Sequence, residues 1–101
     1  MKRNIQLLDC TLRDGCYIVE GSFGAHVIRG LSQKLQTANV DIIECGWLKD
    51  APHKEGSAYY HVPSDADTYL SPTRRAGTTY AVMIDWDRYD LNALPPRTNE
   101  T

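Results

Sequence analysis

The chain has 101 residues, of which 42% are hydrophobic and 24% charged, with a net charge of −2, which is the composition of one small globular domain. Eleven basic residues against thirteen acidic ones, with no basic run longer than Arg74-Arg75, argue against a nucleic-acid partner. The longest apolar run, 81–84, is too short to cross a membrane and no apolar signal segment follows Met1, so we expect a cytoplasmic protein without a membrane partner.

A first short strand is predicted at residues 5–9, where an almost continuous apolar run is typical of a strand covered on both faces. Asp14-Gly15 interrupts this run, and the segment up to residue 24 contains three glycines. Because glycine lets the backbone turn tightly and approach a ligand, we interpret this segment as an ordered loop.

An amphipathic helix is predicted next, at residues 23–38. Ser22 is the expected N-cap, and Asn39 is the expected residue in the left-handed conformation beyond the helix end. The apolar residues at helical spacing are Val27, Ile28, Leu31, Leu35 and Ala38.

A second buried strand is predicted at residues 41–45, which makes the order strand, loop, helix, strand. In such a βαβ unit the right-handed crossover leaves the two strands parallel and adjacent. We therefore expect Asp14 and Glu44 to lie at the same, C-terminal, edge of the sheet.

The segment 47–78 is irregular and is read mostly as loop. A short helix is predicted from Ser64, capped by that serine and carrying Asp65 and Asp67 in its first turn. A third strand follows at 79–85, and Leu91 lies in a further turn or helical stub.

Arg13 and Asp14 form a charged pair where a buried strand leaves the sheet, which is a costly place for charges unless chemistry needs them. Alternating strands and helices with acidic strand ends predict an α/β fold whose site lies at the carboxyl edge. Two architectures have this pattern: a small doubly wound sheet, or the first three strands of a TIM (β/α)8 barrel, which needs about 250 residues when complete.

The residues Leu8-Asp9-Cys10-Thr11-Leu12-Arg13-Asp14-Gly15 resemble the opening motif of the DRE-TIM metallolyases, also called the HMG-CoA-lyase-like family. The resemblance extends to Ile42-Ile43-Glu44-Cys45-Gly46 and, more loosely, to Ala81-Val82-Met83-Ile84-Asp85. It covers essentially the whole chain and is greatest to the aldolase-like branch. It implies that residues 1–101 are a single partial domain, the N-terminal segment of a (β/α)8 barrel.

The resemblance also implies a function: a divalent-metal-dependent aldolase or lyase that cleaves or forms a carbon–carbon bond next to a 2-oxo acid, like 4-hydroxy-2-oxovalerate aldolases or pyruvate carboxyltransferases. The residue matching Asp14 binds the metal, Mg²⁺ or Mn²⁺, which prefers oxygen ligands. The residue matching Arg13 stabilises the enolate oxygen, and the one matching Glu44 lies beside it and orients the guanidinium.

The chain also departs from the family pattern. The family's His-x-His pair, which supplies two further metal ligands, is absent, so the ligand set is incomplete and we expect the fragment alone to be inactive. Tyr17 stands where the aldolases have a histidine base, and it is left to donate or relay a proton, because a phenol with a pKa near 10 is a poor base at neutral pH.

Other readings of the same residues were weighed. The three cysteines, at irregular spacing, are better explained as free thiols than as a disulfide framework or a zinc site. Gly21-Ser22-Phe23-Gly24 lacks the spacing of a dinucleotide fingerprint. The alternative to an enzyme is a catalytically silent α/β module, or binding fragment, whose open sheet edge would lead to self-association.

Overall fold

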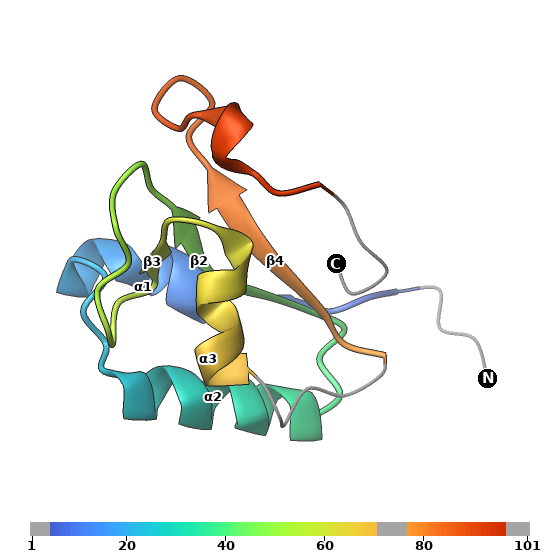
Figure 1. Ribbon diagram of the computed structural model, residues 1–101. Helices are drawn as coiled ribbons and strands as arrows, with labels where there is room; N and C mark the ends of the chain where they lie inside the picture. Colours follow the sequence, from blue (N-terminus) through green and yellow to red (C-terminus); the bar gives the residue numbers. More distant parts are fainter. Residues whose placement is uncertain (1–4, 71–76, 97–101) are drawn as a thin grey trace.

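The computed structural model describes residues 5–70 and 77–96, shown in Figure 1. Within them the chain forms a mixed α/β structure with a small parallel sheet, as the sequence predicted. The strands are β1 (Leu8–Asp9), β2 (Ile42–Leu48), β3 (Tyr59–Tyr60) and β4 (Thr79–Ile84). The helices are α1 (Thr11–Val19), α2 (Ala25–Thr37) and α3 (Asp67–Leu70), with 3₁₀ turns η1 (Pro63–Ala66) and η2 (Leu91–Ala93).

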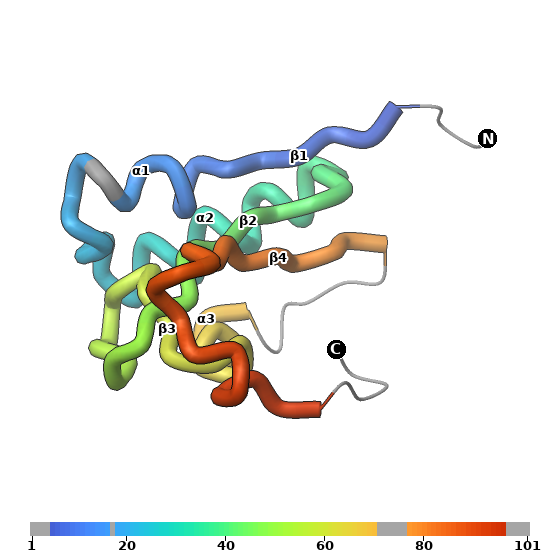
Figure 2. The backbone as a smooth tube through the Cα atoms, turned by 90° about the horizontal axis from the view of Figure 1, so that it is seen from above, coloured from blue at the N-terminus to red at the C-terminus, as the bar shows by residue number. Residues whose placement is uncertain are grey.

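Strand β2 is the centre of the sheet, and every strand paired with it is parallel to it. Its first two residues pair with β1, its last two pair with β3, and β4 pairs along its length. Because a strand has only two edges, β1 and β3 share the edge opposite β4. Figure 2 shows β1, β2 and β4 running side by side. The predicted parallel, adjacent pairing of the first two strands is therefore confirmed.

Helix α2 lies along the sheet with α3 beside it (Figures 1 and 2) and contributes Ile28, Ser32 and Gln36, spaced four residues apart, to the interior. Its end matches the prediction, since Asn39 has a left-handed φ of 63°. Its start does not. The helix begins at Ala25 after Gly24, because Ser22 is held outside it by an antiparallel bridge to Ser57.

Helix α1 corrects the predicted loop between the first strand and α2. The carboxylate of Asp9 accepts hydrogen bonds from the Thr11 backbone N–H (3.0 Å) and hydroxyl (2.9 Å), so it satisfies a donor at the helix start. Leu12 and Cys16, four residues apart, are both fully buried in the core. Packing of this face fixes the helix although Gly15 disfavours it.

The region after β2 is also more ordered than predicted. Strand β3 forms inside the expected loop, because residues 59–60 pair with the end of β2. The short helix predicted from Ser64 exists as η1 followed by α3, but Ser64 does not cap it. Instead the Asp65 carboxylate accepts the N–H groups of His61 (2.9 Å) and Val62 (3.1 Å).

The first strand is shorter and more exposed than predicted. Only residues 8–9 pair with β2, and Leu7 and Leu8 are 56% and 51% exposed. The apolar run at residues 5–9 predicted a strand covered on both faces, but no described segment of the chain covers these side chains. The core lies instead among α1, α2, β2, β3, α3 and the Tyr89 segment. Its buried members include Leu12, Ile28, Cys45, Leu48, Ala58, Tyr60, Tyr69 and Tyr89.

Candidate active site

Arg13 and Glu44 form the shortest ion pair among the described residues. The Arg13 Nε–H donates to Glu44 Oε2 at 2.5 Å, and the two side chains are 22% and 14% exposed. Arg13 lies in the first turn of α1, and Glu44 lies on β2. The hydrogen bond to Glu44 is the largest cause of a raised pKa at Arg13, so the guanidinium stays charged throughout the accessible range.

The backbone around Arg13 is also tied to β2. The Trp47 indole Nε1–H donates to the Arg13 carbonyl at 2.9 Å. The α1 turn is therefore attached to β2 by an ion pair at residue 44 and a hydrogen bond at residue 47. From the sequence, Trp47 could line a substrate pocket or cover the barrel rim, because an indole in a loop-like segment gives no signal of its partner.

Asp14 lies next to this pair, with its Oδ1 atom 3.8 Å from Arg13 Nη1 and its side chain 69% exposed. It faces a hollow of about 370 Å³ at the C-terminal end of β1, lined by Leu8, Asp9, Cys10, Thr11, Asp14 and Gly15. The structure thus brings together the three residues that the sequence placed at one edge: Arg13, Asp14 and Glu44.

The residues around this hollow fit a hard divalent cation in chemical kind, because Asp14 supplies exposed carboxylate oxygen. The other carboxylate, Asp9, already accepts two hydrogen bonds from Thr11. Within residues 5–70 and 77–96, no three His, Cys, Asp or Glu side chains are grouped to hold a metal ion.

Tyr17 belongs to α1 and not to a loop, which corrects its predicted setting. Its side chain lies outside the described part of the structure. Among the three cysteines, all of them free thiols, Cys16 and Cys45 are buried and Cys10 is partly buried. Burial raises the pKa of Cys16 to about 11, so this thiol is protonated at neutral pH and donates to the Leu12 carbonyl at 2.9 Å.

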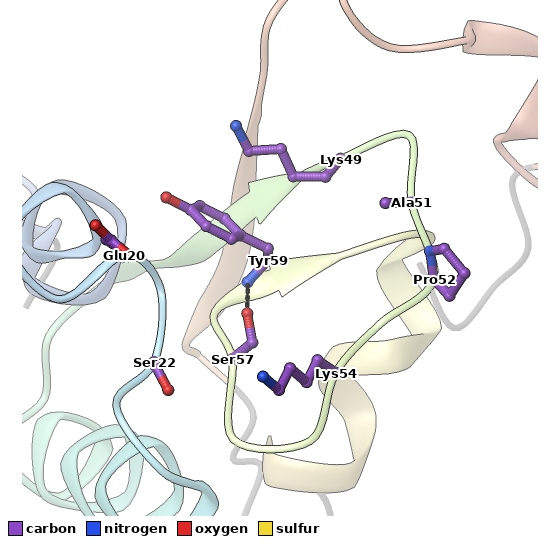
Figure 3. A pocket seen from close by; sticks show the side chains of 8 residues that line it. All are labelled: Glu20, Ser22, Lys49, Ala51, Pro52, Lys54, Ser57 and Tyr59. Carbon is purple, nitrogen blue, oxygen red and sulfur yellow. Dashed lines mark hydrogen bonds between the residues drawn. The ribbon is translucent and has the colours of Figure 1, made fainter.

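A second hollow, which sequence reasoning did not anticipate, lies near the ends of β2 and α1 (Figure 3). Lys49, Lys54 and Tyr59 are on its wall. No motif connects these residues, because they meet only through the pairing of β3 with β2.

Comparison of the chain with protein-family models, with curated proteins and with solved structures finds no match. No helix in the described ranges has the length and apolarity to cross a membrane.

Proposed function

We propose that this chain is the N-terminal part of a metal-dependent aldolase or lyase of the TIM-barrel kind, acting on a carbon–carbon bond next to a 2-oxo acid. The observation that carries the proposal is the Arg13–Glu44 ion pair beside the exposed carboxylate of Asp14. Arg13 and Glu44 are 31 positions apart in the sequence, so their contact supports the proposal independently of the resemblance between motifs.

Arg13 has the chemistry that such a reaction needs. Breaking a carbon–carbon bond next to a 2-oxo acid leaves an electron pair that is delocalised onto the ketone oxygen as an enolate. Of the five N–H donors of a guanidinium, the bond to Glu44 uses the Nε donor and leaves the Nη groups to point at the developing oxyanion. Glu44 fixes the plane of the guanidinium, so Glu44 acts as a positioning residue.

Asp14 would hold the divalent cation, Mg²⁺ or Mn²⁺, together with ligands from outside the described residues. When bound, such a cation polarises the ketone of a 2-oxo acid and neutralises charge on its oxygens. Asp14 lines the hollow, and Arg13 Nη1 lies 3.8 Å from its Oδ1 atom, so a substrate held at this carboxylate would lie next to the guanidinium.

Metal binding is tested on the 101-residue chain with Mn²⁺, whose unpaired electrons broaden nearby NMR signals. We expect amide signals of residues 9–15 to broaden first in a ¹⁵N spectrum. Asp14→Asn removes the effect there, whereas Asp87→Asn, an exposed aspartate after β4, leaves it unchanged. If Mn²⁺ broadens these signals equally in the Asp14→Asn variant and in the unchanged chain, Asp14 is not the metal ligand.

Catalysis is tested in a protein that contains the complete barrel. There, Asp14→Asn abolishes metal-dependent cleavage of a 4-hydroxy-2-oxo acid. Arg13→Lys keeps a positive charge but loses the planar fork, so we expect kcat to fall by about 100-fold or more. Activity that survives Asp14→Asn, or a kcat that Arg13→Lys leaves unchanged, refutes the mechanism.

A second candidate is a catalytically silent α/β module that binds a partner through its open edge. The exposure of Leu7, just before β1, and of Leu8 on β1 favours it, because adjacent apolar side chains at a sheet edge offer a surface for a partner. This function predicts a chain whose ¹⁵N spectrum is insensitive to Mg²⁺ and Mn²⁺ and whose sedimentation depends on concentration. Metal-specific changes at residues 9–15 would exclude it as the sole function.

A further inference from the structure

The second hollow, of about 390 Å³, lies between two loops that are far apart in sequence (Figure 3). One loop follows α1 and the other joins β2 to β3. The lining residues are Glu20, Ser22, Lys49, Ala51, Pro52, Lys54, Ser57 and Tyr59. None of them belongs to the hollow beside Asp14.

Backbone hydrogen bonds hold the two loops together. The Ala58 N–H donates to the Gly21 carbonyl at 2.9 Å, and the Gly24 N–H donates to the Gly56 carbonyl at 2.8 Å. Gly21 also lies flat against the Tyr59 ring, since a Cβ at residue 21 would be 2.7 Å from two ring atoms. The walls are therefore fixed before any ligand arrives, which lowers the entropic cost of binding.

The polar groups on these walls are suited to an anion. Lys49 Nζ lies 4.7 Å from the centre of the Tyr59 ring. Neither Lys49 nor Lys54 forms an ion pair with any side chain in the described ranges. Ser57 Oγ accepts the Tyr59 N–H at 3.0 Å, so its own hydrogen remains to be donated.

Two features of the walls limit the kind of anion that fits this hollow. Glu20 opposes a bound anion and leaves the lining with a net charge of +1, so two lysines are needed to outweigh it. Ala51 and Pro52 form an apolar part of the lining, and Figure 3 shows the lysine side chains extending away from it. A small inorganic anion would not use that wall, but an organic anion would.

We propose that this hollow binds a small organic dianion, through Lys49, Lys54 and the Ser57 hydroxyl, with its apolar part against Ala51 and Pro52. Phosphate monoesters and dicarboxylates share this chemistry. Lysine binds both as a compact point charge. The proposal does not depend on the aldolase function, because it concerns different residues and requires no metal.

The test is a ¹⁵N NMR titration of the 101-residue chain at low ionic strength with three probes: inorganic phosphate, phenyl phosphate and succinate. We expect amide shifts confined to residues 20–22 and 49–59, with a dissociation constant on the order of 1 mM for the best organic probe, weakening as salt is added. A preference for phenyl phosphate identifies a phosphate ester as the ligand class, and a preference for succinate identifies a dicarboxylate.

The Lys49→Gln/Lys54→Gln variant should weaken binding by about tenfold or more, since it removes two charge-assisted contacts. Its matched control is Lys34→Gln/Arg88→Gln, which removes two exposed cations outside the hollow and should change binding by less than about twofold. Glu20→Gln should tighten binding, while Asp87→Asn should not.

Three results would overturn the proposal. They are shifts scattered over the surface, equal weakening in the lysine variant and its control, and an organic probe that binds no more tightly than inorganic phosphate. Far-UV circular dichroism and thermal unfolding of each variant establish that folding is intact. If the double variant does not fold, the Glu20→Gln and Asp87→Asn comparison decides the question alone.

Discussion

Substituting Gly46 with alanine should disrupt the junction between β2 and β3, which positions Ser57 and Tyr59 on the wall of the second hollow. Gly46 has a φ of 151°, at an irregularity in the pairing of β2 with β4 between Glu44 and Gly46. A Cβ added there would lie 2.0 Å from the Ala58 carbonyl oxygen and 2.9 Å from a Tyr60 ring carbon. Neither neighbour is the end of a flexible side chain, so the backbone itself must move.

The size of the effect follows from three costs. Non-glycine backbone at this φ costs about 1–3 kcal/mol. Displacing Ala58 breaks the hydrogen bond that its carbonyl accepts from the Trp47 N–H at 2.9 Å, a loss of about 1 kcal/mol. Overpacking against the buried Tyr60 ring adds about 1–3 kcal/mol. We therefore expect Gly46→Ala to lower the free energy of unfolding by about 3–7 kcal/mol, a large share of the roughly 5–15 kcal/mol typical of a domain.

The measurement is urea unfolding, followed by far-UV circular dichroism and by tryptophan fluorescence, in which the buried Trp47 should change more than the exposed Trp86. The matched control is Gly30→Ala, within α2, where an added Cβ meets nothing within 4 Å. This control should raise the free energy of unfolding by about 0.5–1 kcal/mol, because alanine favours helix. A Gly46→Ala variant within about 1 kcal/mol of the wild type would show that β3 does not approach β2 as described.

Three further outcomes are expected. Iodoacetamide at pH 8 should alkylate Cys10 in the folded chain and spare Cys16 and Cys45, as read by mass spectrometry; rapid labelling of all three would contradict their burial. Burial raises the Cys16 pKa to about 11, from 9.0 for an unperturbed thiol, so the contribution of the neutral thiol to the free energy of unfolding is complete below pH about 9. About 2 kcal/mol of that free energy is lost as the pH rises through 11. Cys16→Ser should remove this part of the pH dependence of stability in chemical unfolding, and an unchanged pH dependence would refute the raised pKa. Leu8→Lys should reduce any self-association seen by sedimentation, whereas Gln33→Lys, on the exposed face of α2, should not; equal effects would exclude β1 as the contact.

The parallel βαβ order could be predicted because hydrophobic spacing along 23–45 reflects local geometry. Asn39 illustrates this: its tolerance of left-handed backbone is a property of the residue itself, and the helix ends where that tolerance is needed. Helix α1 could not be predicted in the same way. Gly15 lowers its intrinsic propensity, and the burial of Leu12 and Cys16 outweighs that cost only when β2 lies beside them.

The candidate site, too, could be predicted from the sequence only in part. Sequence alone determined which chemical groups are present, and it predicted that Arg13, Asp14 and Glu44 lie close together because parallel strands bring their carboxyl ends to one edge. The three residues do come together, but Arg13 and Asp14 lie in α1 and Glu44 lies within β2, so none of them is at a strand end. Only the tertiary structure decided that Glu44 holds the Arg13 guanidinium at 2.5 Å and that Lys49 and Lys54 share a hollow. Contacts of this kind depend on the register between strands and on loops meeting across the sheet, and neither is recorded in the spacing of residues along the chain.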